Sequence, residues 1–142
     1  MTTAWSHLPN AKHIDRILTR ARSNPDKWAI ADVRVWDVAD DADWDIDAAR
    51  HAARDTDCDS SRHAAWNAAR DAVRAECEGA SSAGAARDAC GYAILALIVW
   101  DESADYLKLS VDQVTMFAAL GDHKAILMLP AVMVFKKSKE LV

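Results

Sequence analysis

Six aspartates between Asp37 and Asp47 form the densest group of potentially reactive side chains in this 142-residue chain. From Asp41 onward they occupy every second position, which is the spacing of oxygen ligands at the start of a calcium-binding loop. A loop of the EF-hand type also needs glycine at its sixth position and glutamate at its twelfth. Counted from Asp41, those positions hold Ile46 and Ala52, so the pattern does not predict calcium binding.

Two interpretations of this acidic segment remain open. Aspartates are favoured at a helix start by the helix dipole, so the segment fits a solvated turn followed by a helix. Alternatively, it forms a surface for a basic partner, because ten aspartates and three arginines give Ala31 to Ser60 a formal charge of −7, against −5 for the whole chain. We predict a partner-binding surface made of Asp37, Asp40, Asp41, Asp43, Trp44, Asp45 and Asp47, with Trp44 as an apolar anchor.

A second constellation offers metal chemistry. His51 lies four residues from both Asp47 and Asp55, which places all three on one face of a helix. Two carboxylates and an imidazole are possible ligands for a divalent metal, and His63 would be a fourth. The same spacing is typical of a solvated helix with charge pairs, so a metal-dependent enzyme is only an alternative and we predict no metal or cofactor.

Nucleophilic chemistry has no recognisable motif in this sequence. The G-x-S-x-G motif, the phosphate loop and the dinucleotide fingerprint are all missing. The three cysteines are Cys58, Cys77 and Cys90; an odd number without a C-x-x-C pair favours free thiols in a reducing compartment. We therefore predict that the protein is not an enzyme.

Five arginines share one column of the helical pattern with Trp66, namely Arg50, Arg54, Arg62, Arg70 and Arg74. Arginine beside tryptophan suits nucleic acid, through phosphate contacts and base stacking. Because aspartates fill the adjacent column, we favour ion pairs along the helices and expect no direct nucleic-acid binding. Trp36, Trp44 and Trp66 are interpreted as wedges that fill gaps between alanine faces.

An alanine pattern with a four-residue period runs from Ala48 to Ala75 and predicts that helices position these residues. Each step of four residues turns an α-helix by about 400°, so a single straight helix would carry the alanine stripe around its surface. The capping-rich segment from Thr56 to Ser61 therefore predicts two shorter helices, each with one alanine-rich packing face. The fold class is all-α: a single helical domain over 1–142 with about six to seven helices.

The other expected elements follow from caps and breakers. We expect helices over 10–22, with Asn10 as its cap, over 26–39, over 85–101, over 111–120 and over 123–135. The valines in 29–38 leave a strand open there, although helix is favoured. Pro130 predicts a kink or split near Ile126. Residues 1–9 are expected to be flexible, and 136–142 to form a frayed basic tail.

No signal peptide is evident, and the longest apolar run, Ala93 to Trp100, is too short to span a bilayer. A cytoplasmic location is expected, without contact to a membrane.

The stretch from His63 to Ala72 resembles the AAWxAARDA runs of uncharacterised alanine-rich proteins of tailed phages. The segments from Ala93 to Asp101 and from Leu120 to Ala131 resemble the same group. Near the start of the chain, the patches from His13 to Leu18 and from Asn24 to Trp28 resemble it too. Between Asp32 and Asp47 this chain departs from that group, because it is richer in aspartate and valine than in alanine. The group carries no assigned activity, so no catalytic residue transfers to this chain.

The resemblance implies a phage origin and a location in the host cytoplasm. The function expected is that of a non-enzymatic accessory protein, which binds and modulates or inhibits a host protein through the acidic surface. A basic nucleic-acid-binding groove, as in a defence protein, would be a complementary partner. The alternatives are a self-assembling or virion-associated helical protein, which would be a homo-oligomer, and the metal-dependent enzyme.

Overall fold

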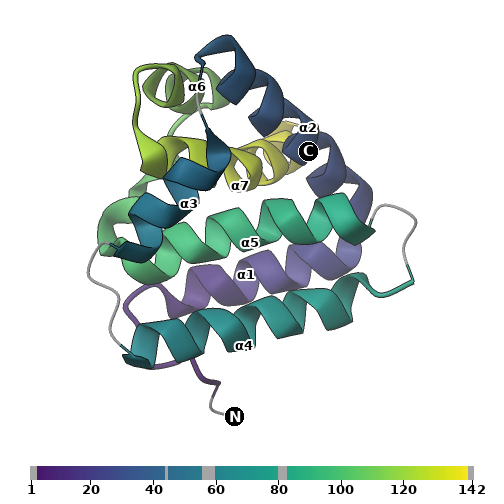
Figure 1. The fold of residues 1–142 in the computed structure, drawn as a ribbon. Helices are drawn as coiled ribbons and strands as arrows, with labels where there is room; N and C mark the ends of the chain where they lie inside the picture. Colours follow the sequence, from purple (N-terminus) through teal and green to yellow (C-terminus); the bar gives the residue numbers. More distant parts are fainter. Residues whose placement is uncertain (1–2, 44, 56–59, 80–82, 141–142) are drawn as a thin grey trace.

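The computed structural model describes residues 3–43, 45–55, 60–79 and 83–140, with side chains as far as Phe135. Over these residues it contains seven α-helices, one 3-10 helix and no strand, which confirms the all-α prediction (Figure 1). The elements are α1 (Ala11–Ser23), α2 (Pro25–Asp41), α3 (Ile46–Asp55), α4 (Ser60–Cys77), α5 (Ala83–Val99), η1 (Asp101–Lys108), α6 (Val111–Ala119) and α7 (His123–Glu140).

The count exceeds the prediction of six to seven helices because the 3-10 helix η1 was not expected. Its residues Asp101, Ser103 and Asp105 are poor formers of α-helix, and the tighter i→i+3 winding accommodates such a short segment.

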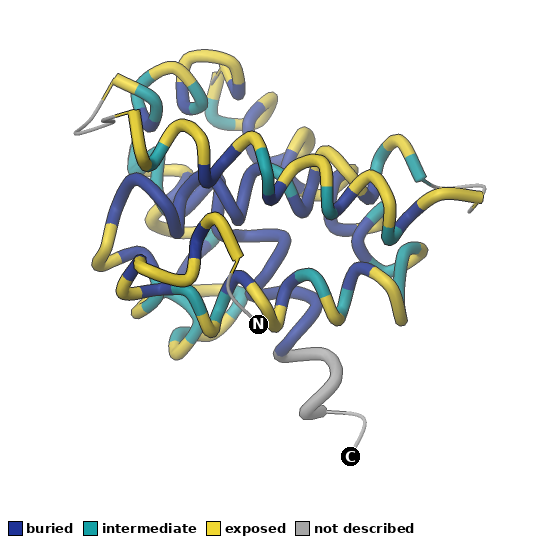
Figure 2. The backbone as a smooth tube through the Cα atoms, turned by 90° about the horizontal axis from the view of Figure 1, so that it is seen from below, coloured by how far each residue is buried: buried dark blue, intermediate teal, exposed yellow. Residues whose placement is uncertain are grey.

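Helix α5 is the centre of the molecule. Every residue from Tyr92 to Trp100 is buried, as expected for a helix that is apolar on all sides. α5 packs against α1 and α4 on one side and against α2, α3 and α7 on the other (Figure 1). Figure 2 shows the same arrangement as a buried centre surrounded by helices whose outer turns are exposed.

The alanine pattern forms two helices, as predicted. α3 ends at Asp55 and α4 begins at Ser60, while 56–59 lie outside the described residues. Ala49 and Ala53 of α3, and Ala65 and Ala69 of α4, are all exposed by 1% or less. Small side chains at these positions let the helix backbones approach closely.

Segment 29–38 is helical, so the strand alternative is wrong. Pro25 occupies the first turn of α2, where its fixed φ angle and missing N–H are tolerated. Trp28, Ala31, Val35 and Val38 form the buried face of α2, in the helical spacing that the sequence indicated.

Two local predictions are wrong, namely the split of the last helix at Pro130 and the capping of α1 by the side chain of Asn10. Pro130 does not split the last helix, because α7 runs from His123 to Glu140 with Pro130 inside it. The side chain of Asn10 does not cap α1, although Asn10 occupies the N-cap position.

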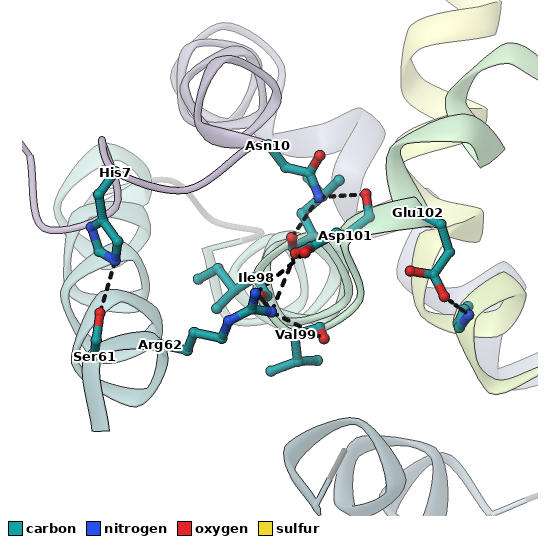
Figure 3. Close-up of polar contacts among 10 residues, drawn as sticks. His7, Asn10, Ser61, Arg62, Ile98, Val99, Asp101 and Glu102 are labelled. Carbon is teal, nitrogen blue, oxygen red and sulfur yellow. Dashed lines mark hydrogen bonds and ion pairs between the residues drawn. The ribbon is translucent and has the colours of Figure 1, made fainter. Parts of the chain in front are cut away.

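Asn10 instead satisfies the end of α5. Its Nδ2 donates hydrogen bonds to the carbonyl oxygens of Leu97 and Asp101, at 2.8 and 2.9 Å (Figure 3). The last carbonyls of a helix lack partners within the helix, and burial makes an unsatisfied carbonyl costly. The side chain of Asn10 therefore forms these long-range hydrogen bonds and does not cap α1.

Residues 3–9 pack against the fold, whereas residues 1–9 were expected to be flexible. Trp5 and Leu8 are buried, and Nε1 of Trp5 donates a hydrogen bond to Oδ1 of Asp15 at 2.9 Å. The N-cap of α6 is Ser110, which forms a reciprocal capping box with Gln113.

Within the described residues, no helix is both long enough and apolar enough to cross a bilayer.

Candidate functional site

The six aspartates of the acidic segment are all exposed and lie where α2 turns into α3. We call this group the acidic corner; it comprises Asp37, Asp40, Asp41, Asp43, Asp45 and Asp47. Asp43 has a φ of +58°, a left-handed conformation that aspartate tolerates better than most residues. Oδ1 of Asp45 accepts a hydrogen bond from the backbone N–H of Asp47 at 2.9 Å. The last two members of the corner therefore help to start α3.

The first three aspartates of the acidic corner lie at the end of a helix and not at the start of one. Asp37, Asp40 and Asp41 lie in the last turns of α2, where the helix dipole presents its negative end. No basic residue occupies the last turn of α2. Carboxylates in this position are mildly destabilising, by about 0.3–1 kcal/mol each at an exposed helix end. The dipole therefore accounts for Asp45 and Asp47 and leaves the aspartates of α2 without a stabilising local role.

The corner is also poorly neutralised. Asp47 pairs with Arg50 across 3.4 Å, and both side chains retain substantial exposure. In the part of the chain that the structure describes, the other five aspartates form no ion pair. Their negative charge consequently faces solvent.

An apolar stripe adjoins the corner on the outer face of α2. Ile30 and Val33 are each 59% exposed, and Trp36 is 43% exposed. Their spacing of three residues places them on the same side of the helix as Asp37 and Asp40. Trp36 was interpreted as a wedge between alanine faces, and this is wrong because the inner face of α2 is already filled by Trp28, Ala31, Val35 and Val38.

The predicted anchor Trp44 lies outside the described residues. The structure thus offers Ile30, Val33 and Trp36 as apolar neighbours of the aspartates. Sequence reasoning missed this stripe, although α2 carries two sets of apolar residues at helical spacing and only one of them can face the core.

The metal constellation stays on the surface of α3. Nδ1 of His51 lies 2.7 Å from the backbone carbonyl of Asp47, and Asp47, His51 and Asp55 are all exposed. Across the described ranges, no three or more histidine, cysteine, aspartate or glutamate side chains gather closely enough to hold a metal ion. The structure therefore gives the metal alternative no support.

A serine and a histidine do meet at the surface. Oγ of Ser61 lies 2.8 Å from Nε2 of His7, and both residues are exposed (Figure 3). A catalytic pair of this kind needs a third group that orients the imidazole. Among the residues described, none hydrogen-bonds the other ring nitrogen of His7, so the contact fastens the N-terminal segment to α4.

The predicted arginine column separates into different roles. Nη1 of Arg62 donates to the carbonyl oxygens of Ile98 and Val99, at 2.9 and 3.3 Å, and Arg62 also pairs with Asp101 (Figure 3). The guanidinium groups of Arg54 and Arg70 lie 5.1 and 4.7 Å from the ring centre of Trp66.

Trp66 is only 5% exposed, which confirms it as a wedge in the core. Because its ring is buried between α4 and its neighbours, it does not offer a face on which a nucleobase could stack.

Two cysteines and one acid are among the titratable groups buried in the described part of the chain. Cys77 and Cys90 are free and buried, and burial raises the pKa of both thiols. Asp32 of α2 is 8% exposed, and burial, followed by the nearby Asp88, raises its pKa to about 6. Sequence reasoning did not single out Asp32, because its position beside Ala31 on the inner face of α2 was the only signal.

No family model, curated protein or solved structure was found to match this chain.

Proposed function

We propose that this protein is a non-enzymatic accessory protein, and that it binds and modulates another protein through the acidic corner and the apolar stripe of α2. The observation that carries the proposal is the position of Asp37, Asp40 and Asp41 at the negative end of the α2 dipole. Residues that cost stability where they stand are often present for binding, because function tolerates a modest loss of stability.

The composition of this surface suits a protein partner. Protein interfaces combine an apolar centre with a polar rim, and exposed apolar groups beside charged ones are typical of such sites. Ile30, Val33 and Trp36 supply the apolar part and the acidic corner supplies the charged part. The complementary partner is a protein with a basic and partly apolar groove, such as a nucleic-acid-binding protein. The resemblance to tailed-phage proteins suggests that this partner belongs to the host.

The alternative of self-assembly through alanine faces has less support. Ala49, Ala53, Ala65 and Ala69 are buried within the chain and are not available to a second copy. Light scattering on the purified protein would test this alternative directly.

The test is quantitative capture from a host lysate with the wild type and three variants of the protein. The first variant combines Asp37→Asn, Asp40→Asn and Asp41→Asn, and the second carries Trp36→Ser. The matched control combines Asp71→Asn and Asp105→Asn, which are exposed acids on α4 and η1.

We expect a basic protein that the wild type and the control retain and both site variants lose. Retention should fall as salt rises, because exposed charges are screened within about 10 Å at 0.1 M. If every retained protein binds the site variants as well as the control, the α2 surface is the wrong choice. Circular dichroism of each variant would show that the fold is kept.

A further inference from the structure

A second charged surface, of opposite sign, lies between α4 and α5. It contains an open cavity of about 340 Å³ lined by Arg70, Arg74, Gly84, Arg87 and Asp88. Small-molecule sites span roughly 300–1,000 Å³, so this cavity has room for a small ligand.

The cavity continues along one face of α5. A smaller hollow of about 50 Å³ shares Arg70, Arg87 and Asp88 with it and adds Arg50, Trp66, Gly91 and Tyr92. The α5 residues in the two hollows follow a helical spacing, and so do the residues from α4. We call the combined feature the arginine groove; it follows α4 and α5 where the two helices pack against each other.

The three arginines that line the larger cavity are available to a ligand. In the portion of the chain that is described, Arg70, Arg74 and Arg87 form no ion pair with a carboxylate. Among the described lining residues, three guanidinium groups and the carboxylate of Asp88 give a formal charge of +2. A cavity of this charge favours an anion with at least two negative charges.

The N-terminus of α5 also favours an anion in the cavity. Gly84 is the second residue of this 17-residue helix and lines the cavity. The first N–H groups of a helix lack partners within the helix, and the dipole there favours negative charge. A Cβ atom built at Gly84 meets nothing within 4 Å, so the space beside this helix end is open.

We infer that the arginine groove binds a small polyphosphate-type anion, such as pyrophosphate, tripolyphosphate or the phosphate chain of a nucleotide. Guanidinium groups recognise phosphate oxygens through paired, charge-assisted hydrogen bonds. This inference does not depend on the proposed protein-binding function, since it rests on different residues.

A nucleic-acid strand fits the groove less well, for two reasons. Trp66 and Tyr92 are each 5% exposed, and Arg70 and Arg50 lie over their rings, so neither ring offers a stacking surface for a base. At its α3 end the groove reaches Arg50, which pairs with Asp47 of the acidic corner. A strand that extended in this direction would meet the aspartates, whereas a short anion would not.

The test is calorimetric titration of the whole protein with sodium pyrophosphate and tripolyphosphate, and separately with a single-stranded oligonucleotide. The site variants are Arg74→Gln and Arg87→Gln. The matched control is Arg34→Gln, which removes an exposed arginine from α2. We expect single-site binding of tripolyphosphate, weakened at least tenfold by each site variant and less than twofold by the control.

Gly84→Asp separates binding from folding. The helix dipole favours a negatively charged side chain in the first turn of α5, so the variant should fold at least as stably as the wild type. Its carboxylate enters the open space at the cavity, so we expect tripolyphosphate binding to be lost. The inference is overturned if tripolyphosphate does not bind, if the site variants bind as tightly as the control, or if only the oligonucleotide binds.

Discussion

Asp32→Asn should make this protein more stable, and the gain should depend on pH. Asp32 is 8% exposed, and its Oδ1 has no hydrogen-bond partner among the described residues. Burial, followed by the charge of Asp88, raises the pKa of Asp32 from 3.8 to about 6. Ionised Asp32 is therefore an unfavourable group in the folded state at neutral pH.

The size of the effect follows from linkage. A shift of about two units corresponds to about 3 kcal/mol, because each unit is about 1.4 kcal/mol. Between pH 3.8 and 6 the folded state holds a proton that the unfolded state has lost, so stability falls as pH rises through this window. Above the window the full cost is present, and below it the cost disappears.

The amide of Asn has the shape of a protonated carboxyl and never ionises. At pH 8 we therefore expect Asp32→Asn to raise the free energy of unfolding by up to about 3 kcal/mol, or the Tm by roughly 10 °C. At pH 4 the gain should be less than about 1 kcal/mol. Urea unfolding followed by circular dichroism at both pH values measures the difference.

Asp37→Asn is the matched control, because it removes an exposed carboxylate from the same helix. Its effect should be small and similar at pH 4 and pH 8. An equal gain from Asp32→Asn at the two pH values, or a loss at pH 8, would refute the assignment of an ionised, uncompensated Asp32.

Three further changes test the packing and the helix ends. Gly91→Ala should stabilise the fold by about 0.5–1 kcal/mol, because glycine inside a helix is unfavourable and an added Cβ meets nothing within 4 Å. An unchanged or lower Tm in thermal melts would contradict this. Asn10→Ala should cost about 1–3 kcal/mol, because the carbonyls of Leu97 and Asp101 lose a buried donor. Urea denaturation measures this, and a loss below about 0.5 kcal/mol, the low end for an ordinary hydrogen bond, would show that the contact is dispensable. Ser110→Ala should cost about 1 kcal/mol through loss of the capping box, measured in the same way, and an unchanged midpoint would contradict the capping role.

The helical fold was predictable because its signals are local. The alanine period, Pro25 and Ser110 each act within one or two turns, and the structure places helix ends close to them. Asn10 misled for the opposite reason, since its side chain serves the end of α5, which lies far away in the sequence. This requirement is not visible in the neighbouring sequence. Pro130 also departs from its local signal, since α7 continues through it and its side chain is buried.

The same contrast between local and long-range signals applies to the candidate surfaces. The acidic corner could be identified from composition, but its position at the negative end of α2 required the helix boundaries. The arginine groove was not predictable from the column of arginines, because that column contains residues with unrelated roles. Arg62 secures the end of α5, whereas Arg74 joins Arg87 at a cavity that only the pairing of α4 with α5 creates.

The moderate net charge of this chain conceals two surfaces of opposite sign. Residues 31–60 carry a formal charge of −7, so the rest of the chain carries +2. The two surfaces meet at the ion pair of Asp47 with Arg50, where the acidic corner ends and the arginine groove begins. A partner that draws Asp47 away from Arg50 would free a guanidinium group beside the groove, and an anion bound in the groove would compete with Asp47 for it. Because binding couplings are reciprocal, either ligand should change the affinity of the protein for the other by the same factor.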